Sequence, residues 1–342
     1  MKEIPIRSLA LAGLFLCALA PASAVTYTEN FASDPARDGW QIFGTTNLFQ
    51  WNITNQNLQV TWDSTQSNTY FFHPLEFAVT ANDDFSVAFD INLSDIVSDT
   101  EPGKTGPMQL GFEFLDLAAA TDPSFVRNNY GTVPNIAGLD YYAYGYFTFG
   151  DTVYPSDPAT TPTFVSGTDP YDYAPQTISV YDNTLPDNQV VHMSFSYTAS
   201  NQTAVVSVTT NGVPLVQLPP LALNGGNGFT DPTYDFSVDT FCLCNFTSIG
   251  DPYNSILAHG TIANLVVTVP PPAQNLSTAF SNGVCQVQFT DHLDWMYTLQ
   301  RTTNIVAWTD VSASVSGNGT NLILSDSDAP PLGAFYRVSA TR

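Results

Sequence analysis

The sequence predicts an all-β protein, and three observations in one stretch support this class. Apolar and polar side chains alternate from Val191 to Tyr197, which is the pattern of a half-buried strand. A polar turn around Asn201 separates this run from a second apolar run at 205–208. Asn211-Gly212 then gives the strongest short-range hairpin signal, before a third run at 213–215. Three antiparallel strands in a meander are therefore expected.

The first 24 residues have the features of a cleaved secretory signal. Lys2 and Arg7 give a basic start, residues 9–20 are apolar, and Ala22-Ser23-Ala24 is a cleavage signal of the A-x-A type. The apolar run is too short to span a bilayer, and no other run is long enough to form a membrane helix. We therefore expect a mature protein that starts near Val25 and is secreted, without membrane insertion.

The mature chain is strongly acidic. The full chain has a formal charge of −23; without Lys2, Arg7 and Glu3, six basic and 30 acidic residues remain, which gives −24. Such a surface repels phosphate backbones and anionic lipids, so the chain is expected not to bind nucleic acid. Acidity of this kind is typical of a soluble secreted protein, although Asp-rich loops also favour Ca²⁺.

The three cysteines of the mature chain leave their pairing open. Cys242, Cys244 and Cys285 are an odd number, so one disulfide and one remaining thiol are expected in an oxidising compartment. A Cys242–Cys244 bridge would close a tight, strained loop, and a Cys244–Cys285 bridge would join two domains. Metal binding by the three thiols is a third alternative.

Pro270-Pro271-Pro272 is the clearest break in the chain, because a proline run cannot continue a strand ladder. Together with the cleavage signal, this break divides the chain into four parts. They are a signal peptide at 1–24, a large β domain at 25–269, a Pro-rich linker at 270–274 and a small β module at 275–342.

The large domain shows strand patterns near both ends and in its middle. It opens with Tyr27–Phe31 and closes with Ile262–Val269, in which Leu265, Val267 and Val269 face one way. Residues 85–93 and 108–115 are further strands. The stretches 116–134 and 150–175 lack periodicity and are predicted to be long loops.

This order resembles the concanavalin A-like lectin and glucanase superfamily, including its laminin-G-like members. The similarity rests on the Phe31 and Gly39-Trp40 opening, on the Asn211-Gly212 meander and on the Ile262-Ala-Asn-Leu closing strand. It implies a jelly-roll sandwich whose first and last strands pair. It also implies recognition of a glycan or a cell-surface polymer.

The tail module contains about five short strand patterns. They cover 284–290, 297–303, a segment around Trp308, 321–325 and 335–340. The stretch 297–309, followed by Phe335-Tyr-Arg-Val, is similar to fibronectin-III-like modules at the C-termini of secreted bacterial proteins. That similarity implies a spacer or attachment role.

The densest aromatic tract predicts a sugar-binding ladder. On a strand through 140–149, Tyr142, Tyr144 and Tyr146 would project from one face, where tyrosine rings stack on sugar C–H faces. The alternative is that these tyrosines pack beneath a long loop. Glu113 would add a carboxylate, because it alternates away from the apolar Leu110, Phe112 and Phe114.

Catalysis is the weaker interpretation of this face. Glycoside hydrolysis needs two carboxyl groups across the scissile bond. The glucanase branch carries a Glu-x-Asp-x-x-Glu run, whereas this chain has only Glu113-Phe-Leu-Asp116. The mature glutamates are confined to four positions, Glu29, Glu76, Glu101 and Glu113. A polysaccharide hydrolase or lyase therefore stays an alternative.

A structural Ca²⁺ is expected by the same resemblance, near the paired terminal strands. Glu29 and Asn264 occupy the matching positions, although related chains often have Asp where Asn264 stands. The leading interpretation is thus a secreted, non-catalytic protein that binds a glycan or cell-surface polymer. A purely structural component of an extracellular matrix or surface layer is the third possibility.

Overall fold

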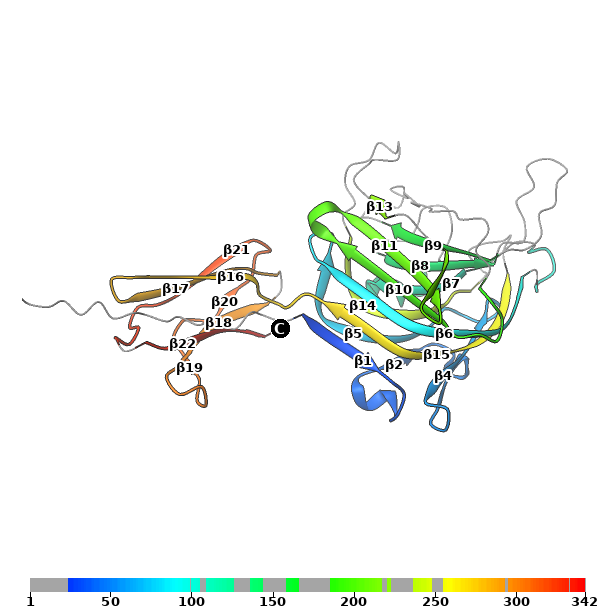
Figure 1. Ribbon diagram of the computed structural model, residues 1–342, viewed down its shortest axis with the longest axis horizontal. Coiled ribbons are helices and arrows are strands. Elements are labelled where there is room, and N and C mark those ends of the chain that lie inside the picture. The colour runs from blue at the N-terminus through cyan, green and yellow to red at the C-terminus, as the bar shows by residue number, and fades with distance from the viewer. Residues whose placement is uncertain are drawn as a thin grey trace, which may run out of the picture. The chain divides into compact units, whose positions relative to one another are not determined.

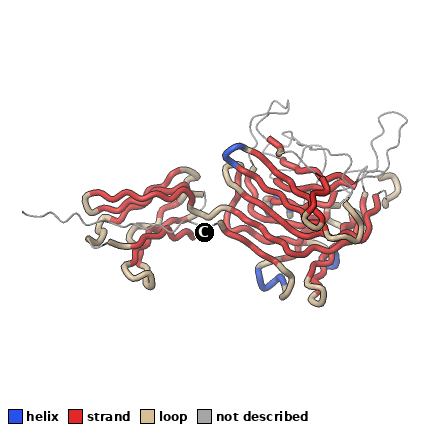
Figure 2. The backbone as a smooth tube through the Cα atoms, in the orientation of Figure 1, coloured by secondary structure: helices blue, strands red, loops and turns tan. Residues whose placement is uncertain are grey.

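The chain folds into two compact units, 24–270 and 271–342, and the boundary lies within Pro270-Pro271-Pro272. The computed structural model describes residues 24–98, 100–104, 109–125, 136–143, 158–165, 185–216, 220–222, 236–247, 255–292, 295–331 and 333–341. Nearly all regular structure in both units is strand (Figure 2). The predicted all-β class is confirmed.

The larger sheet of the first unit has nine strands in the order β12-β11-β10-β6-β15-β4-β3, with β1 added to β15 and β13 to β11 (Figure 1). The strands are β1 (Val25–Glu29), β3 (Phe49–Asn52), β4 (Asn57–Asp63), β6 (Phe85–Ser98), β10 (Val191–Thr198), β11 (Thr203–Thr210), β12 (Val213–Val216), β13 (Leu221–Ala222) and β15 (Ile256–Val269).

The second sheet of this unit has six strands in the order β2-β5-β14-β7-β8-β9. They are β2 (Gln41–Phe43), β5 (Thr69–Thr80), β7 (Gln109–Leu115), β8 (Ile136–Ala143), β9 (Pro158–Val165) and β14 (Ser237–Asn245). Among the described residues, four short helical turns connect strands. They are η1 (Pro35–Asp38), η2 (Thr46–Leu48), α1 (Leu117–Ala120) and η3 (Ala199–Asn201).

Aromatic rings from the two sheets pack against one another and form the core. Phe89 of the nine-stranded sheet stacks on Phe112 of the six-stranded sheet with 4.6 Å between ring centroids, and Phe85 meets Phe114 edge-on at 4.8 Å. Full burial of one such side chain contributes roughly 1.5–3 kcal/mol. The sandwich therefore has one shared inner layer and two outer faces, and function must be sought on the outer faces or at the rims.

The first and last strands of the large unit lie side by side. β1 pairs antiparallel with the end of β15, from Val25 opposite Val269 to Glu29 opposite Leu265. The inward positions Leu265, Val267 and Val269 are completely buried. This pairing confirms the expectation drawn from the two ends of the domain.

The predicted meander is also present. β10 pairs antiparallel with β11, and β11 pairs with β12. Between β11 and β12, Asn211 has φ of 49° and Gly212 has φ of 74°. Positive φ at both central residues is what a two-residue hairpin turn of type I′ requires.

The expectation of long loops is wrong in part. Residues 158–165 form β9, the outermost strand of the six-stranded sheet, and residues 117–120 form α1. The sequence did not predict β9 because Pro158 and Pro162 suggest a loop. At the edge of a sheet, however, the missing N–H of proline is tolerated. α1 begins after Asp116, whose carboxylate accepts a hydrogen bond from Ala119 N at 3.1 Å.

The second unit is a small sandwich of two sheets. One has the order β16-β17-β21, and in the other β18 pairs with β19, β20 and β22. The strands are β16 (Gln274–Ser281), β17 (Val284–Thr290), β18 (Met296–Thr302), β19 (Thr309–Asp310), β20 (Val315–Ser316), β21 (Asn321–Asp326) and β22 (Phe335–Thr341). The sequence predicted most of them but missed β16 and the two-residue β20; on β16, Leu276 and Phe280 are the large apolar residues among eight positions.

The described part of the chain contains no helix that is both long enough and apolar enough to cross a bilayer.

Candidate functional site

The outer face of the six-stranded sheet holds the sequence-predicted Glu113. Cross-strand register places two adjacent rows at its centre. The rows are Gln41–Phe72–Cys242–Glu113–Gly138 and Phe43–Tyr70–Cys244–Gly111. Small residues thus occupy the middle of the face, on β14, β7 and β8, and aromatic residues stand toward its β2 edge.

Glu113 lies at the middle of this face but has no exposed surface. Its β8 neighbour is Gly138, and a Cβ added there would lie 2.6 Å from Phe112 O and 2.7 Å from Glu113 Cα. Only glycine fits so close an approach. The side chain of Glu113 therefore points outward, as the alternation predicted, yet it is sealed from solvent.

Described residues cover one end of the outer face. A Cβ added at Gly111 would lie 2.8 Å from the Phe246 ring, which also meets Tyr70 edge-on at 6.1 Å. The Tyr70 hydroxyl donates a hydrogen bond to Ala120 O at the end of α1, at 3.0 Å. Tyr70 and Cys244 are consequently buried, and this end of the face is a second apolar layer rather than an open platform.

Two of the three described cysteines lie on this same face. Cys242 and Cys244 are buried, as is Cys285 of the second unit, and all three carry thiols rather than disulfides. The Cys244 thiol donates to Cys242 O at 3.8 Å. Burial raises the pKa of the Cys242 thiol, and the Glu113 carboxylate opposite it raises the pKa further. A buried thiol of this kind is inert.

Phe43 is the aromatic side chain that stays accessible at the edge of this face. It stacks on Tyr70 with 5.7 Å between ring centroids and 14° between ring planes, and 37% of its surface is exposed. The sequence prediction missed Phe43. The available signal was an adjacent pair of apolar residues, Ile42 and Phe43, directly before a glycine that adopts positive φ.

The structure describes only one of the three tyrosines of the predicted ladder. Tyr142 belongs to β8, where its backbone pairs with Gln109. Tyr144 and Tyr146 lie outside the described residues. The sugar-platform prediction for these three residues therefore stays a prediction.

Glu29, one of the two predicted metal ligands, is a buried carboxylate at the end of β1. It is 2% exposed, and its Oε1 accepts a hydrogen bond from Phe31 N at 2.5 Å. Its Oε2 accepts no hydrogen bond within the described part of the chain. Burial raises the pKa of Glu29; the Phe31 hydrogen bond opposes this, and the charges of Asp38 and Asp34 add to it.

Asn264, the second predicted ligand, lies away from Glu29. Glu29 shares the inward position opposite Leu265, whereas Asn264 is exposed at a bulge with φ of 51°. Asn264 Nδ2 donates to Asp90 Oδ2 at 2.7 Å, and His192 Nδ1 lies 2.9 Å from Asp90 Oδ1. Among the described residues, no three acidic, histidine or cysteine side chains come together as metal ligands.

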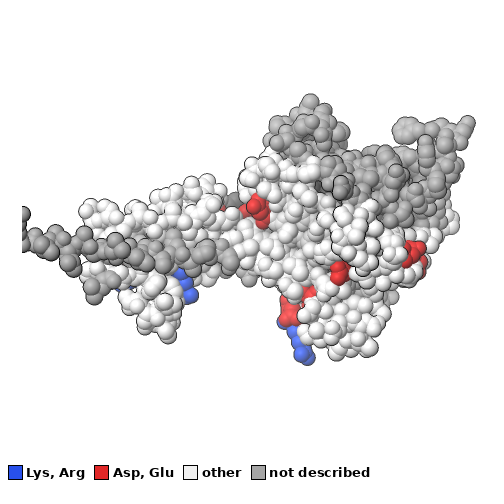
Figure 3. Space-filling view, in the orientation of Figure 1, with Lys and Arg blue, Asp and Glu red and all other residues white. Residues whose placement is uncertain are grey.

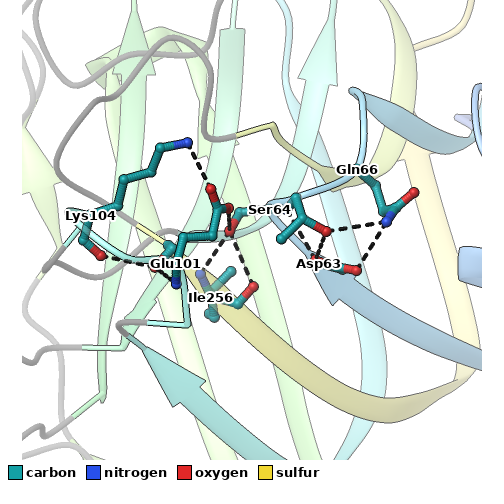
Figure 4. Close-up of polar contacts among 8 residues, drawn as sticks. Asp63, Ser64, Gln66, Glu101, Lys104 and Ile256 are labelled. Atoms are coloured by element: carbon teal, nitrogen blue, oxygen red, sulfur yellow. Dashed lines mark hydrogen bonds and ion pairs between the residues drawn. The ribbon is translucent and has the colours of Figure 1, made fainter.

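A polar network at one end of the sandwich was not predicted (Figure 4). The Ser64 hydroxyl lies 3.2 Å from both Glu101 Oε1 and Ile256 O, and it accepts from Ile256 N at 2.9 Å. Lys104, the only lysine among the described residues, pairs with Glu101 Oε2 at 2.8 Å. These contacts fasten the 100–104 turn to the ends of β4 and β15, which is a structural role.

Comparisons with known proteins give fold neighbours at low similarity. No protein-family model matches the chain, and no curated protein matches it either. Among solved structures, lectin II from Ulex europaeus is 12% identical with a TM-score of 0.43, over 72% of this chain and 98% of the lectin. Peanut lectin is 12% identical with a TM-score of 0.40, over 72% of this chain and 99% of the lectin.

An enzyme is found at the same level. The alginate lyase Aly36B is 13% identical with a TM-score of 0.38, over 73% of this chain and 97% of the lyase. At such identities and TM-scores, neither the lectins nor the lyase assigns an activity to this chain. The proposals below rest on the residues of the chain itself.

Proposed function

We propose that this chain is a secreted, non-catalytic protein that binds a glycan or cell-surface polymer. The observation that carries the proposal is Phe43, a partly exposed ring stacked on Tyr70 at the rim of the six-stranded sheet. A ring held flat by a neighbour offers a preformed apolar surface to the C–H face of a sugar. Tyr142, Tyr144 and Tyr146 are proposed to extend this platform along the sheet.

The burial of Glu113 supports the non-catalytic part of the proposal. A carboxyl group must touch its substrate to transfer a proton or to attack. Glu113 has no exposed surface and lies beside a buried thiol at Cys242. The hydrolase or lyase alternative would therefore need the residues over Glu113 to move before chemistry begins.

The test is a glycan array probed with the mature chain and with Phe43→Ala. We expect the wild type to bind at least one glycan and Phe43→Ala to bind it roughly tenfold more weakly, a loss of about 1.4 kcal/mol. Ile53→Ala is the matched control, because Ile53 is 61% exposed on the turn between β3 and β4. Equal binding by Phe43→Ala and wild type removes the platform, and an array without signal favours the structural alternative.

Calcium is proposed as a structural ion near Glu29. The supporting observation is the buried Oε2, which accepts no hydrogen bond in the described part of the chain and lies near the charges of Asp34 and Asp38. A divalent cation would offset this repulsion. Glu29 would then be its side-chain ligand, with backbone carbonyls and water completing an oxygen shell. Asn264 would not be a ligand; its hydrogen bond to Asp90 would hold the neighbouring bulge of β15 in place.

The second unit is proposed to be a fibronectin-III-like spacer or attachment module. Its first, second and sixth strands form one sheet, β16-β17-β21, while β18, β19 and β22 lie in the other. This division resembles that of immunoglobulin-like sandwiches. Such a module would hold the large unit away from whatever surface the chain is attached to.

A further inference from the structure

The outer face of the nine-stranded sheet is uncharged over two complete rows that cross five strands. We call these ten positions the uncharged face. The rows are Val205–Ser196–Ser86–Thr268–Thr26 and Ser207–Ser194–Ala88–Val266–Thr28, running from β11 through β10, β6 and β15 to β1. None of the ten is buried, whereas the alternating positions Val206, Phe195, Val87 and Val267 are.

This absence of charge contrasts with the rest of the unit. Residues 24–270 include 25 acidic and three basic residues. Acidic side chains appear only as scattered patches on the side drawn in Figure 3. A sheet face exposed to water normally carries charges that prevent association. Here the acidic residues are placed elsewhere, so the uncharged face is free to lie against another surface.

The carboxylates that border the uncharged face are held by neighbours. Asp90 is bonded to His192 and Asn264, at 2.9 and 2.7 Å. Asp95, further along β6, lies 2.8 Å from His259 Nδ1. Asp90 exposes 23% of its side chain and Asp95 exposes 54%, so the uncharged face ends at this border.

The chemistry of the uncharged face favours one kind of occupant. Seven of its ten side chains carry a hydroxyl, each of which both donates and accepts hydrogen bonds. Protein interfaces are rich in aromatic residues and arginine and poor in serine and alanine, so a protein partner or a second copy fits badly. Polyanions are repelled by the surrounding acidic residues. A neutral polysaccharide offers matching hydroxyls and requires no charge to be desolvated.

We propose that the uncharged face binds a neutral polysaccharide lying flat across β11, β10, β6, β15 and β1. Four strand spacings span about 19 Å, and the two rows lie about 7 Å apart. This area suits several sugar units of an extended chain, or the surface of a packed polymer. The site is separate from the Phe43 platform, which is on the other sheet.

The experiment is depletion of the full mature protein from solution by insoluble cellulose and by insoluble chitin. Ser194 lies inside the uncharged face on β10, between Ala88 and Ser207. Ser194→Glu and Ser194→Arg both place a long charged side chain there. For a neutral ligand, both substitutions should weaken binding at least tenfold. For an anionic ligand, the arginine would strengthen binding instead.

Ser277→Glu and Ser277→Arg are the matched controls, because Ser277 is exposed on β16 of the second unit. Ser207→Arg is the second test variant should Ser194 variants lose their thermal transition. The proposal is overturned if the wild type is retained by neither polymer, or if Ser194→Arg binds like the wild type or better. It is also overturned if light scattering shows a wild-type dimer that Ser194→Arg dissociates, because a second copy then occupies the face.

The same variants separate this proposal from the Phe43 platform. Loss of binding in Ser194→Arg with full binding in Phe43→Ala supports the uncharged face and counts against the platform. The reverse pattern supports the platform and overturns the proposal for the uncharged face.

Discussion

Buried carboxylates in this protein differ in how well they are satisfied. Asp326 is 2% exposed and accepts hydrogen bonds from Arg301 Nη1 at 2.7 Å, the Tyr336 hydroxyl at 2.8 Å and Asp328 N at 3.0 Å. Glu29 is equally buried but accepts from Phe31 N alone. A buried carboxylate with few donors favours its protonated form. Ionisation of Glu29 therefore opposes folding.

The first prediction concerns the pH dependence that follows. The pKa of Glu29 is raised in the folded state from an ordinary 4.5, so the folded chain holds this proton more tightly than the unfolded chain. The stability that Glu29 contributes is then greatest below pH 4.5 and declines as the pH rises through the folded-state pKa. Without metal, Glu29→Gln should raise the unfolding free energy at pH 7 by on the order of 1 kcal/mol, with the gain vanishing near pH 4.

Urea unfolding in EDTA at both pH values measures this difference in unfolding free energy, and equal stability of the wild type and Glu29→Gln at pH 7 contradicts the prediction.

Calcium binding is tested with the same two proteins. If Ca²⁺ is bound, adding it in excess should raise the melting temperature of the wild type but not that of Glu29→Gln. A wild-type melting temperature that is the same in Ca²⁺ and in EDTA contradicts the calcium proposal while leaving the pH prediction intact.

The second prediction concerns the thiols. Cys242, Cys244 and Cys285 have no exposed surface and form no disulfides. We expect reductant to leave the melting temperature unchanged. We also expect iodoacetamide to label the cysteines only after denaturant is added, because a buried thiol with a raised pKa reacts slowly. Mass spectrometry counts the labels; rapid labelling of the native mature chain, or a melting temperature lowered by reductant, contradicts the assignment.

At the scale of elements, two glycines are required for different physical reasons. Gly212 has φ of 74°, and a Cβ added there would meet nothing within 4 Å. Gly111, on β7, is constrained by packing instead, since a Cβ added there would lie 2.8 Å from the Phe246 ring. One glycine is required by backbone conformation and the other by close packing.

The third prediction follows from that contrast. Gly212→Ala should lower the unfolding free energy by about 1 kcal/mol, through backbone strain alone. Asn211→Gly, the matched change at the neighbouring position, should cost little because glycine adopts positive φ readily. Chemical denaturation of both variants gives the comparison. A Gly212→Ala variant as stable as the wild type contradicts the type I′ assignment of the β11–β12 turn.

Strands were predictable where period-2 alternation was strong. β10, β17 and β22 were anticipated within a residue or two, because one of their faces is apolar and the other polar. β9 and β16 were missed for two physical reasons. Proline at 158 and 162 suggests loop, although a sheet edge accepts it. On β16 the less exposed face mixes Gln274 and Thr278 with Leu276 and Phe280, so no continuous apolar face marks the strand.

At the scale of the whole molecule, the outer faces of the sandwich could not be read from the sequence. Alternation correctly placed Glu113 opposite Phe112 and Phe114, but a one-dimensional pattern does not reveal that Phe246 and α1 lie over the same sheet. The uncharged face was hidden for the same reason. Its ten residues come from five strands that span positions 26 to 268, and only the sheet register brings them together.

Charge distribution gives the molecule its expected selectivity. A surface with 25 acidic and three basic residues over 24–270 repels other polyanions, while the uncharged face on the same unit is proposed to bind a neutral polymer. Binding through hydroxyls and partly exposed rings should also be insensitive to salt, because no ion pairs form across the contact.

The most direct measurement compares binding of the full mature chain to neutral and to anionic polysaccharides, each at low and at high salt. The account predicts retention by a neutral polymer such as cellulose or chitin, unchanged by salt, and no retention by alginate. Binding to alginate alone, or binding to the neutral polymer that disappears as salt is raised, would contradict a neutral glycan as the ligand.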